Sequence, residues 1–299
     1  MIGIMNIYKT LIFSFALITL ISCGNETQKN KQTTSSILVK VDSLDNAIKD
    51  KLTSFKWQLS LDHHRMAEKE GAYTPPAIVT IFSDSEINSK ILENNDQLIA
   101  LDLPFKVLAY SEPDTISVKL AYTSAEFIAR RHDLTSNLLI DYSNRLDAVL
   151  SAVDKSVISE TQTDEISIGF GIIKLKSDFD FNTTLKRLKE TINSISDTKI
   201  FGEIDYQKDA EKTGIELNPT TLLLFGAPEP GAKAMVKAPK LGVDAFCQKL
   251  LVFENGNGEV WVALNDIIAF SKLYYDKATV PQRMINKRLE KTITSTIRK

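Results

Sequence analysis

The stretch LDHHRMAEKEGAYTPPAIVTIF, residues 61–82, recurs later in the chain as IDYQKDAEKTGIELNPTTLLLF, residues 204–225. At this offset of 143 residues the two stretches are identical at Asp62/Asp205, Ala67/Ala210, Glu68/Glu211, Lys69/Lys212, Gly71/Gly214, Pro76/Pro219 and Phe82/Phe225. Further on, Lys106 aligns with Lys249, and after a one-residue gap Ala121 aligns with Ala263. Similarity at a fixed spacing is typical of a duplicated structural unit. The sequence therefore predicts one module that occurs twice.

Both copies show the same order of expected elements. In the second copy, apolar and β-branched residues predict strands at 166–176, 200–204, 221–225, 249–254 and 259–264. Apolar residues at helical spacing predict a helix that begins near residue 182, and Asn255-Gly256-Asn257-Gly258 predicts a hairpin between the last two strands. Neighbouring strands interrupted by helices favour an α+β fold, in which helices cover an antiparallel sheet.

The repeat also predicts how the chain is divided. We expect a first module at residues 37–143, a second module at 166–280 and, between them, a connecting helix and linker at 144–165. Residues 281–299 form a predicted amphipathic helix, with Ile285, Leu289 and Ile293 on one side and mostly basic residues on the other. Such a helix either packs on its domain or lies on an anionic membrane surface, and we favour packing.

The N-terminus has the features of a secretory signal. Residues 11–22 form an apolar run that is shorter than the roughly 20 residues of a membrane span and typical of a signal-peptide core. The run ends in Leu20-Ile21-Ser22-Cys23, which resembles the lipobox of bacterial lipoproteins. This resemblance implies removal of residues 1–22 and attachment of fatty acids such as palmitate at Cys23. Residues 23–36 are then a flexible tether to a membrane of the bacterial cell envelope, on its periplasmic or outer surface.

The repeated residues resemble a family known only as domain-of-unknown-function family 302. In the second copy the matching residues are Asp205, Gly214, Pro219-Thr220-Thr221, Phe225-Gly226-Ala227-Pro228, Gly242-Val243-Asp244, Lys249 and Asn265-Asp266. The first copy supplies Asp62-His63, Leu101-Asp102-Leu103-Pro104-Phe105-Lys106 and Ala129-Arg130-Arg131-His132. The resemblance covers residues 37–280 and implies a compact α+β fold with a curved antiparallel sheet. It implies no activity.

Each copy departs from the family pattern. The second copy has Tyr206 in place of a His, Ala227 in place of an Asn, and Phe246-Cys247 in place of Leu-Pro. The first copy keeps the His but reads Ser83-Asp84-Ser85 where the pattern has Gly-Asn-Pro. A functional site of the family is therefore either assembled from both copies, or has decayed or been redeployed here. We favour the second interpretation.

The candidate ligand-binding residues are Asp62, His63, His132, Asp205, Gly226, Asn265 and Asp266. A metal site at Asp62 and His63 is disfavoured because its counterpart in the second copy would contain Tyr206, so we predict no metal. Gly226 opens the loop GAPEPG, which could hold an anion at a helix N-terminus but lacks the Lys-Ser/Thr of a phosphate loop. Asp205 and Asp266 precede predicted helices, where a capping role is expected on structural grounds alone.

Composition and missing motifs limit the classes of function. With 36 Lys and Arg against 38 Asp and Glu, the formal net charge is -2, and we do not expect nucleic-acid binding. Common hydrolase, zinc-protease and redox motifs are absent from the sequence, and we predict no cofactor. We therefore expect a non-catalytic protein that binds a small amphipathic ligand or an envelope protein in a cleft between the modules. The alternative is an enzyme, or a metal- or cofactor-binding protein, with a site at Asp62/His63 and Asn265/Asp266.

Overall fold

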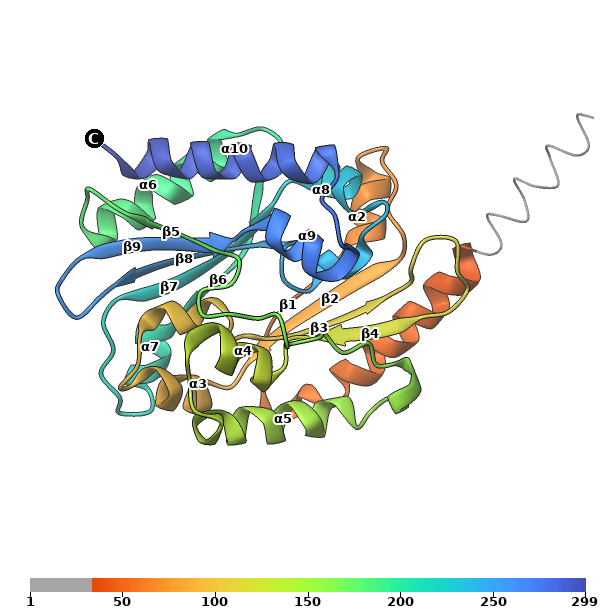
Figure 1. The fold of residues 1–299 in the computed structure, drawn as a ribbon, viewed down its shortest axis with the longest axis horizontal. Helices are drawn as coiled ribbons and strands as arrows, with labels where there is room; N and C mark the ends of the chain where they lie inside the picture. The colour runs from red at the N-terminus through yellow and green to blue at the C-terminus, as the bar shows by residue number, and fades with distance from the viewer. Residues whose placement is uncertain (1–33) are drawn as a thin grey trace, which may run out of the picture.

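The computed structural model describes residues 34–299, which contain two antiparallel sheets (Figure 1). The first sheet has four strands in the order β1-β2-β3-β4, and the second has five in the order β5-β9-β8-β7-β6. The predicted signal peptide, Cys23 and tether residues 23–33 lie outside the described residues. Residues 34–36, which we assigned to the tether, are helical and continue into a helix that runs to residue 49. No helix between residues 34 and 299 is long and apolar enough to cross a membrane.

The first copy alternates strands with short helices. Its elements are a helix at residues 34–49, η1 (Leu52–Ser54), β1 (Lys56–Asp62), α2 (His63–Lys69), β2 (Ala77–Ser83), α3 (Ser85–Leu92), η2 (Gln97–Leu101), β3 (Phe105–Tyr110), β4 (Lys119–Tyr122), α4 (Ala125–His132), η3 (Ser136–Leu139) and α5 (Ile140–Leu150). A last short turn, η4 (Lys155–Val157), leads toward the second copy.

The second copy repeats this order. Its elements are β5 (Ile172–Lys176), α6 (Phe181–Ser194), β6 (Lys199–Asp205), α7 (Tyr206–Glu211), β7 (Thr220–Gly226), α8 (Pro228–Met235), η5 (Pro239–Gly242), β8 (Gln248–Glu254), β9 (Val260–Asn265), α9 (Ile267–Tyr275) and α10 (Val280–Ile297). The strand predicted at 166–176 begins only at Ile172, because Gly169 and Gly171 adopt positive φ in the turns before it.

Local backbone details confirm the duplication. Three features recur at positions 143 residues apart: an irregularity in the first strand (Trp57/Leu59 and Ile200/Gly202), an aspartate N-cap (Asp62 and Asp205) and a left-handed aspartate after a helix (Asp133 and Asp276). Strand register is conserved as well, since Phe82 pairs with Phe105 in the first sheet and Phe225 pairs with Gln248 in the second. The α+β fold with internal duplication is therefore confirmed.

The two copies share one hydrophobic core. Their sheets approach each other at β1 and β6, where Leu59 lies close to Gly202. Helix contacts across the boundary are reciprocal, because α2 packs on α8 and the equivalent α7 packs on α3. The largest core cluster accordingly contains residues of both copies, such as Leu108 and Leu251. The two modules therefore form one folded body. The reciprocal contacts relate one module to the other by an approximate two-fold axis.

A closing helix covers the outer face of each sheet. In the first copy Tyr142 of α5 stacks on Phe105 of β3, and in the second Ile293 of α10 packs with Leu250 of β8. Figure 1 shows α10 and α6 together over the second sheet and α5 below the first. The sequence analysis placed α5 and α10 outside the two modules. In the structure each helix packs on the sheet of its own copy.

Candidate functional site

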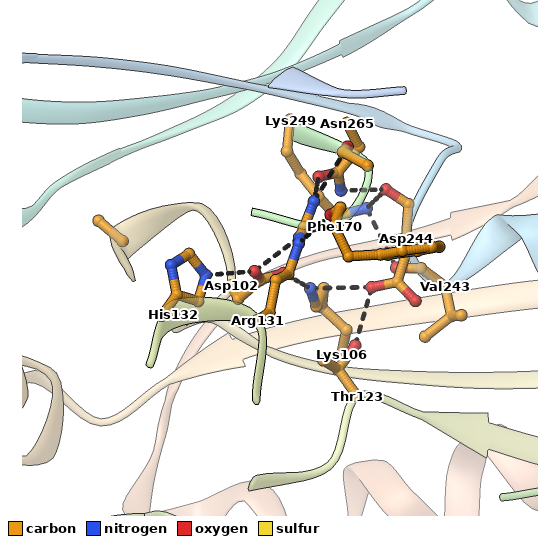
Figure 2. Close-up of polar contacts among 12 residues, drawn as sticks. Asp102, Lys106, Thr123, Arg131, His132, Phe170, Val243, Asp244, Lys249 and Asn265 are labelled. Atoms are coloured by element: carbon orange, nitrogen blue, oxygen red, sulfur yellow. Dashed lines mark hydrogen bonds and ion pairs between the residues drawn. The ribbon is translucent and has the colours of Figure 1, made fainter. Parts of the chain in front are cut away.

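Charged side chains meet where the inner faces of the two sheets approach each other. Along β3 and β8 the side chains alternate, so that Lys106 and Lys249 point inward while their neighbours Phe105 and Gln248 lie on the side of the closing helices. Both lysines are fully buried. They belong to a cluster that we call the buried polar network. Figure 2 shows Asp102, Lys106, Thr123, Arg131, His132, Asp244, Lys249 and Asn265 of this network, and Tyr274 completes it through a hydrogen bond to Asp244.

Lys106 bridges the two copies at the centre of this network. Its Nζ lies 3.1 Å from Oδ1 of Asp102 in its own copy and 3.0 Å from Oδ1 of Asp244 in the other. Arg131 pairs with the second oxygen of Asp102 at 2.7 Å. Burial would raise the pKa of the Asp102 carboxyl, but the Arg131 and Lys106 charges outweigh it and hold this pKa well below its usual range. Both carboxyls are therefore ionised at neutral pH, as is Lys106, whose pKa the two carboxylates raise against the effect of burial.

Equivalent residues of the two copies complete the network in similar ways. His132 Nε2 lies 2.8 Å from Asp102, and Tyr274, at the matching position, donates to Asp244 at 2.5 Å. Asn265 accepts a hydrogen bond from Arg131 at 2.8 Å and donates to the Asp244 carbonyl at 2.9 Å. The network thus satisfies its buried charges, as burial requires, mainly with partners in the same copy. The Lys106–Asp244 and Arg131–Asn265 contacts join the two copies.

Lys249 occupies the counterpart of the Lys106 position without a carboxylate partner of its own. Its Nζ donates to the carbonyl oxygens of Val243 and Cys247 at 3.1 Å and of Asp244 at 3.3 Å. Burial lowers its pKa to about 8, against the opposing effect of the Cys247 thiol and the Asp244 carboxylate. The amine is nevertheless enclosed, so it has no route to a substrate in this conformation.

The burial of this network determines what it can do. Asp102, Lys106, Arg131, Lys249 and Asn265 are all 0% exposed. Groups that solvent cannot reach cannot contact a substrate, whereas a buried ion network that crosses a boundary fixes the arrangement of the two sides. Its evident role is to join the two copies in one register. Such networks are destabilised strongly when one partner is removed.

Three of the predicted site residues are helix caps. Asp62 accepts from the backbone N–H of Arg65, Asp205 from that of Lys208, and Asp266 from that of Ile268. The capping role expected for Asp205 and Asp266 is confirmed. Asp62 also pairs with the Arg65 side chain, whose other carboxylate partner is Asp42.

The other predicted residues fall into two places. His132 and Asn265 belong to the buried polar network, whereas His63 and Gly226 border a small pocket between the copies. His63 begins helix α2 rather than ending a strand, and burial lowers its pKa to about 4. Lys249 connects the junction between His63 and the buried polar network. Its charge lowers the pKa of His63, and its Nζ donates to the Asp244 carbonyl, which also accepts a hydrogen bond from Asn265. The residues of the alternative site at Asp62/His63 and Asn265/Asp266 therefore lie in three places. Asp62 and Asp266 are helix caps, His63 borders the small pocket, and Asn265 belongs to the buried polar network.

The pocket that His63 borders, which we call the junction pocket, is the nearest feature to the expected cleft between modules. It has a volume of about 30 Å³ and is lined by Leu61, His63 and Met66 of the first copy and by residues around Gly226 and Phe246 of the second. This is room for a few waters. Within residues 34–299 no group of three or more His, Cys, Asp or Glu side chains is arranged to hold a metal ion.

A larger pocket, which we call the outer pocket, lies under the closing helix of the second copy. It has a volume of about 60 Å³ and is formed by α6, α10 and the ends of β7 and β8, with Leu188, Phe225, Leu250, Ile285 and Leu289 among its apolar walls. Gln248 is a polar residue of the wall, and Arg288 lies at the rim in an ion pair with Asp197. An apolar cavity with few polar groups is the usual form of a small-molecule site.

Sequence reasoning missed the centre of the network and the outer pocket. Asp102, Lys106, Arg131, Asp244 and Lys249 were recognised as family motif residues but not as one cluster. The signal was present, because Lys106 and Lys249 interrupt apolar strands at equivalent positions of both copies. The outer pocket was missed as a whole, although the predicted residue Gly226 is part of its wall. A further signal was Gln248, a polar residue where an apolar side chain is expected on a buried strand face.

Comparison with known proteins fits this duplicated architecture. The family model described as "Domain of unknown function DUF302" matches the chain twice, at residues 30–153 and 173–296. The chain belongs to this family. Both matches extend through most of α5 or α10, so in the DUF302 pattern these helices are the last elements of their modules.

Similar proteins with names are matched only over part of their length. The chain is 29% identical over 99 residues to "Fluoride-specific ion channel FluC 1" of Brucella suis biovar 1 (strain 1330), which covers 33% of this chain and 38% of that protein. FluC 1 of Brucella abortus biovar 1 (strain 9-941) matches at the same identity over 36% of its length. The chain thus spans less than two fifths of these relatives. An uncharacterized conserved DUF302 protein from Bacillus stearothermophilus, of known crystal structure, is 16% identical with a TM-score of 0.35, over 42% of this chain and 95% of that one.

Proposed function

We propose that the protein is a lipid-anchored cell-envelope protein that binds a small amphipathic ligand in the outer pocket without catalysing a reaction. The observation that carries the proposal is the outer pocket itself, a cavity of about 60 Å³ with apolar walls and a single buried amide at Gln248. This volume is several times the roughly 10–15 Å³ that one water requires. The residues of the alternative enzyme site lie outside this pocket: Asp62 and Asp266 cap helices, His63 borders the junction pocket and Asn265 belongs to the buried polar network.

Binding to the outer pocket is tested by titrating 1-hexanol into the full-length protein while methyl NMR signals are recorded. Leu250 and Ile293 line the pocket, and the residues at the equivalent positions of the first copy are Val107 and Leu150. We expect saturable shifts at Leu250 and Ile293 and none at Val107 and Leu150. Equal shifts at both pairs of methyls would indicate nonspecific partitioning and would contradict the proposal.

The lipid anchor has a separate test. The LISC sequence at residues 20–23 supports acylation of Cys23, so cells that produce the protein should incorporate labelled palmitate into it. The Cys23→Ala variant should carry no label and should leave the membrane fraction. Cys247→Ala is the matched control, because that thiol is buried in the folded protein and should not affect labelling. Label that persists in Cys23→Ala would contradict the anchor.

A further inference from the structure

The first copy fills the space under its closing helix with four aromatic rings. Phe82 and Phe105, paired neighbours on β2 and β3, stack at 5.1 Å between ring centroids, and Tyr142 of α5 stacks on Phe105 at 4.2 Å. Phe55 packs edge-on against both phenylalanines, at 5.0 and 5.4 Å. The Phe105 ring therefore lies between two parallel rings, an arrangement that adds to the stabilisation from burial.

The second copy lacks three of these four rings. At the offset of 143 residues, Phe82 corresponds to Phe225, which is retained, whereas Phe55, Phe105 and Tyr142 correspond to Thr198, Gln248 and Ile285. All four of these residues of the second copy line the outer pocket. The pocket thus lies where the first copy places its stacked rings. The first copy is an internal template for what that space accommodates.

Gln248 leaves one hydrogen-bonding group unused in the pocket. The side chain is only 3% exposed, and its Nε2 donates to the Ala245 carbonyl. Its Oε1 is buried and accepts no hydrogen bond from any residue between 34 and 299. An unpaired buried acceptor is unfavourable, which points to a donor that the ligand supplies.

The rim does not favour a charged ligand. Arg288 is the cation among the residues that line the pocket, and both of its terminal nitrogens are engaged by the Asp197 carboxylate at 2.7 and 2.6 Å. Its counterpart Arg145 is engaged in the same way, by Asp84 and Ser54, beside the filled aromatic cluster. No cation along the described lining is therefore available to a carboxylate or phosphate.

We propose that the outer pocket binds a small neutral aromatic ring that carries one O–H or N–H donor, of the phenol or indole class. The ring takes the place of the Phe105 ring, packed against Phe225, and its donor reaches Oε1 of Gln248. This inference rests on the proposed function and narrows the ligand from amphiphiles in general to ring-shaped donors.

The experiment compares phenol with anisole, its methyl ether, which has the same ring but no donor. Dissociation constants are measured with the full-length protein from the Leu250 methyl shift, for the natural sequence and for two variants. Gln248→Leu introduces an apolar side chain of similar size and removes the hydrogen-bond acceptor. Gln248→Phe restores the ring of the first copy, whose structure shows that Phe fits beside its strand partner.

The natural protein should bind phenol about five- to tenfold more tightly than anisole, the factor expected for one hydrogen bond. Gln248→Leu should bind both compounds equally, and Gln248→Phe should bind neither. Equal affinity for both compounds in the natural protein, or a phenol preference that survives in Gln248→Leu, would overturn the inference. Binding of 1-hexanol with no binding of either ring would overturn it while leaving the proposed function intact. Failure of all three compounds to bind would reject both.

Discussion

The inner and outer faces of the duplicated sheets have diverged to different extents. On the inner faces the copies remain alike, with Lys106 opposite Lys249 in the repeat and with aspartates at positions 102 and 244. On the outer faces the first copy packs aromatic rings where the second has the outer pocket. The difference is explained by what each face contacts. An inner residue must fit both copies at once, whereas an outer residue such as Phe105 or Leu250 packs against elements of its own copy.

The comparison separates residues that hold the fold from residues that are free to acquire a ligand. The buried polar network contains the family motif residues and is closed to solvent. The outer pocket keeps some residues of the first copy, such as Phe225 and Arg288, but replaces the rings of Phe55, Phe105 and Tyr142 with Thr198, Gln248 and Ile285. We therefore expect the ligand-binding site where the side chains of the two copies differ, in the outer pocket, rather than where they are the same.

The largest effect is expected from removing a charge of the inner face. Asp102→Asn leaves Arg131 buried without a carboxylate and leaves Lys106 with Asp244 alone, and should lower the free energy of unfolding by about 3–5 kcal/mol. Urea denaturation measures this change. Glu86→Gln is the matched control, because Glu86 forms an exposed pair with Lys90 at the same spacing along the chain, and it should leave the midpoint unchanged. Equal destabilisation by the two variants would contradict the conclusion that the buried charges of the inner faces hold the fold.

The second prediction concerns variants that exchange equivalent residues of the two outer faces, Phe105 and Gln248. Phe105→Gln removes a stacked ring and buries an amide, and should cost about 3–5 kcal/mol in urea denaturation. The reverse change, Gln248→Phe, places a ring into existing space and should cost less than about 1.5 kcal/mol, the range of tolerated core substitutions. A large loss of stability in Gln248→Phe would show that the two outer faces are not geometrically equivalent.

The smallest effect is a pH dependence at the junction pocket. Burial lowers the pKa of His63 to about 4, with Asp62 opposing the shift and Lys249 adding to it. The unfolded chain therefore binds a proton near pH 6.5 that the folded protein binds only near pH 4, so His63 lowers stability as the pH falls through this window. Compared with His63→Leu, the natural protein should lose more stability between pH 7 and pH 4.5. Parallel stability curves for the two proteins would contradict this assignment.

The fold could be predicted well from the sequence because the pattern of each element occurs in both copies, and each copy supports the interpretation of the other. The capping role predicted for Asp205 is confirmed, and the structure shows that Asp62, its counterpart in the repeat, caps the equivalent helix. Gly71 and Gly214 both have positive φ in the turns after these helices. Boundaries were less accurate where local geometry decides them, as at Gly169 and Gly171 before β5. The predicted packing of α10 on its domain is confirmed, but α5 and α10 were placed outside the module bounds. An amphipathic pattern shows which side of a helix is buried but not against which sheet.

The candidate site was less predictable than the fold. Asn265 and His132 were predicted as ligand-binding residues, and the structure places both in the buried polar network. Their partners Arg131 and Asp102 lie 134 and 30 residues away in the chain, and only the fold brings them together. The outer pocket depends on three absent rings, and an absence is visible only once the copies are superposed residue by residue.

Native mass spectrometry on the full-length protein extracted from its own envelope tests the central claim most directly. The account predicts that the protein with its natural sequence carries a small additional mass, and that Gln248→Phe, prepared in the same way, carries none because the ring fills the outer pocket. The same additional mass on both proteins would place the ligand elsewhere and contradict the account.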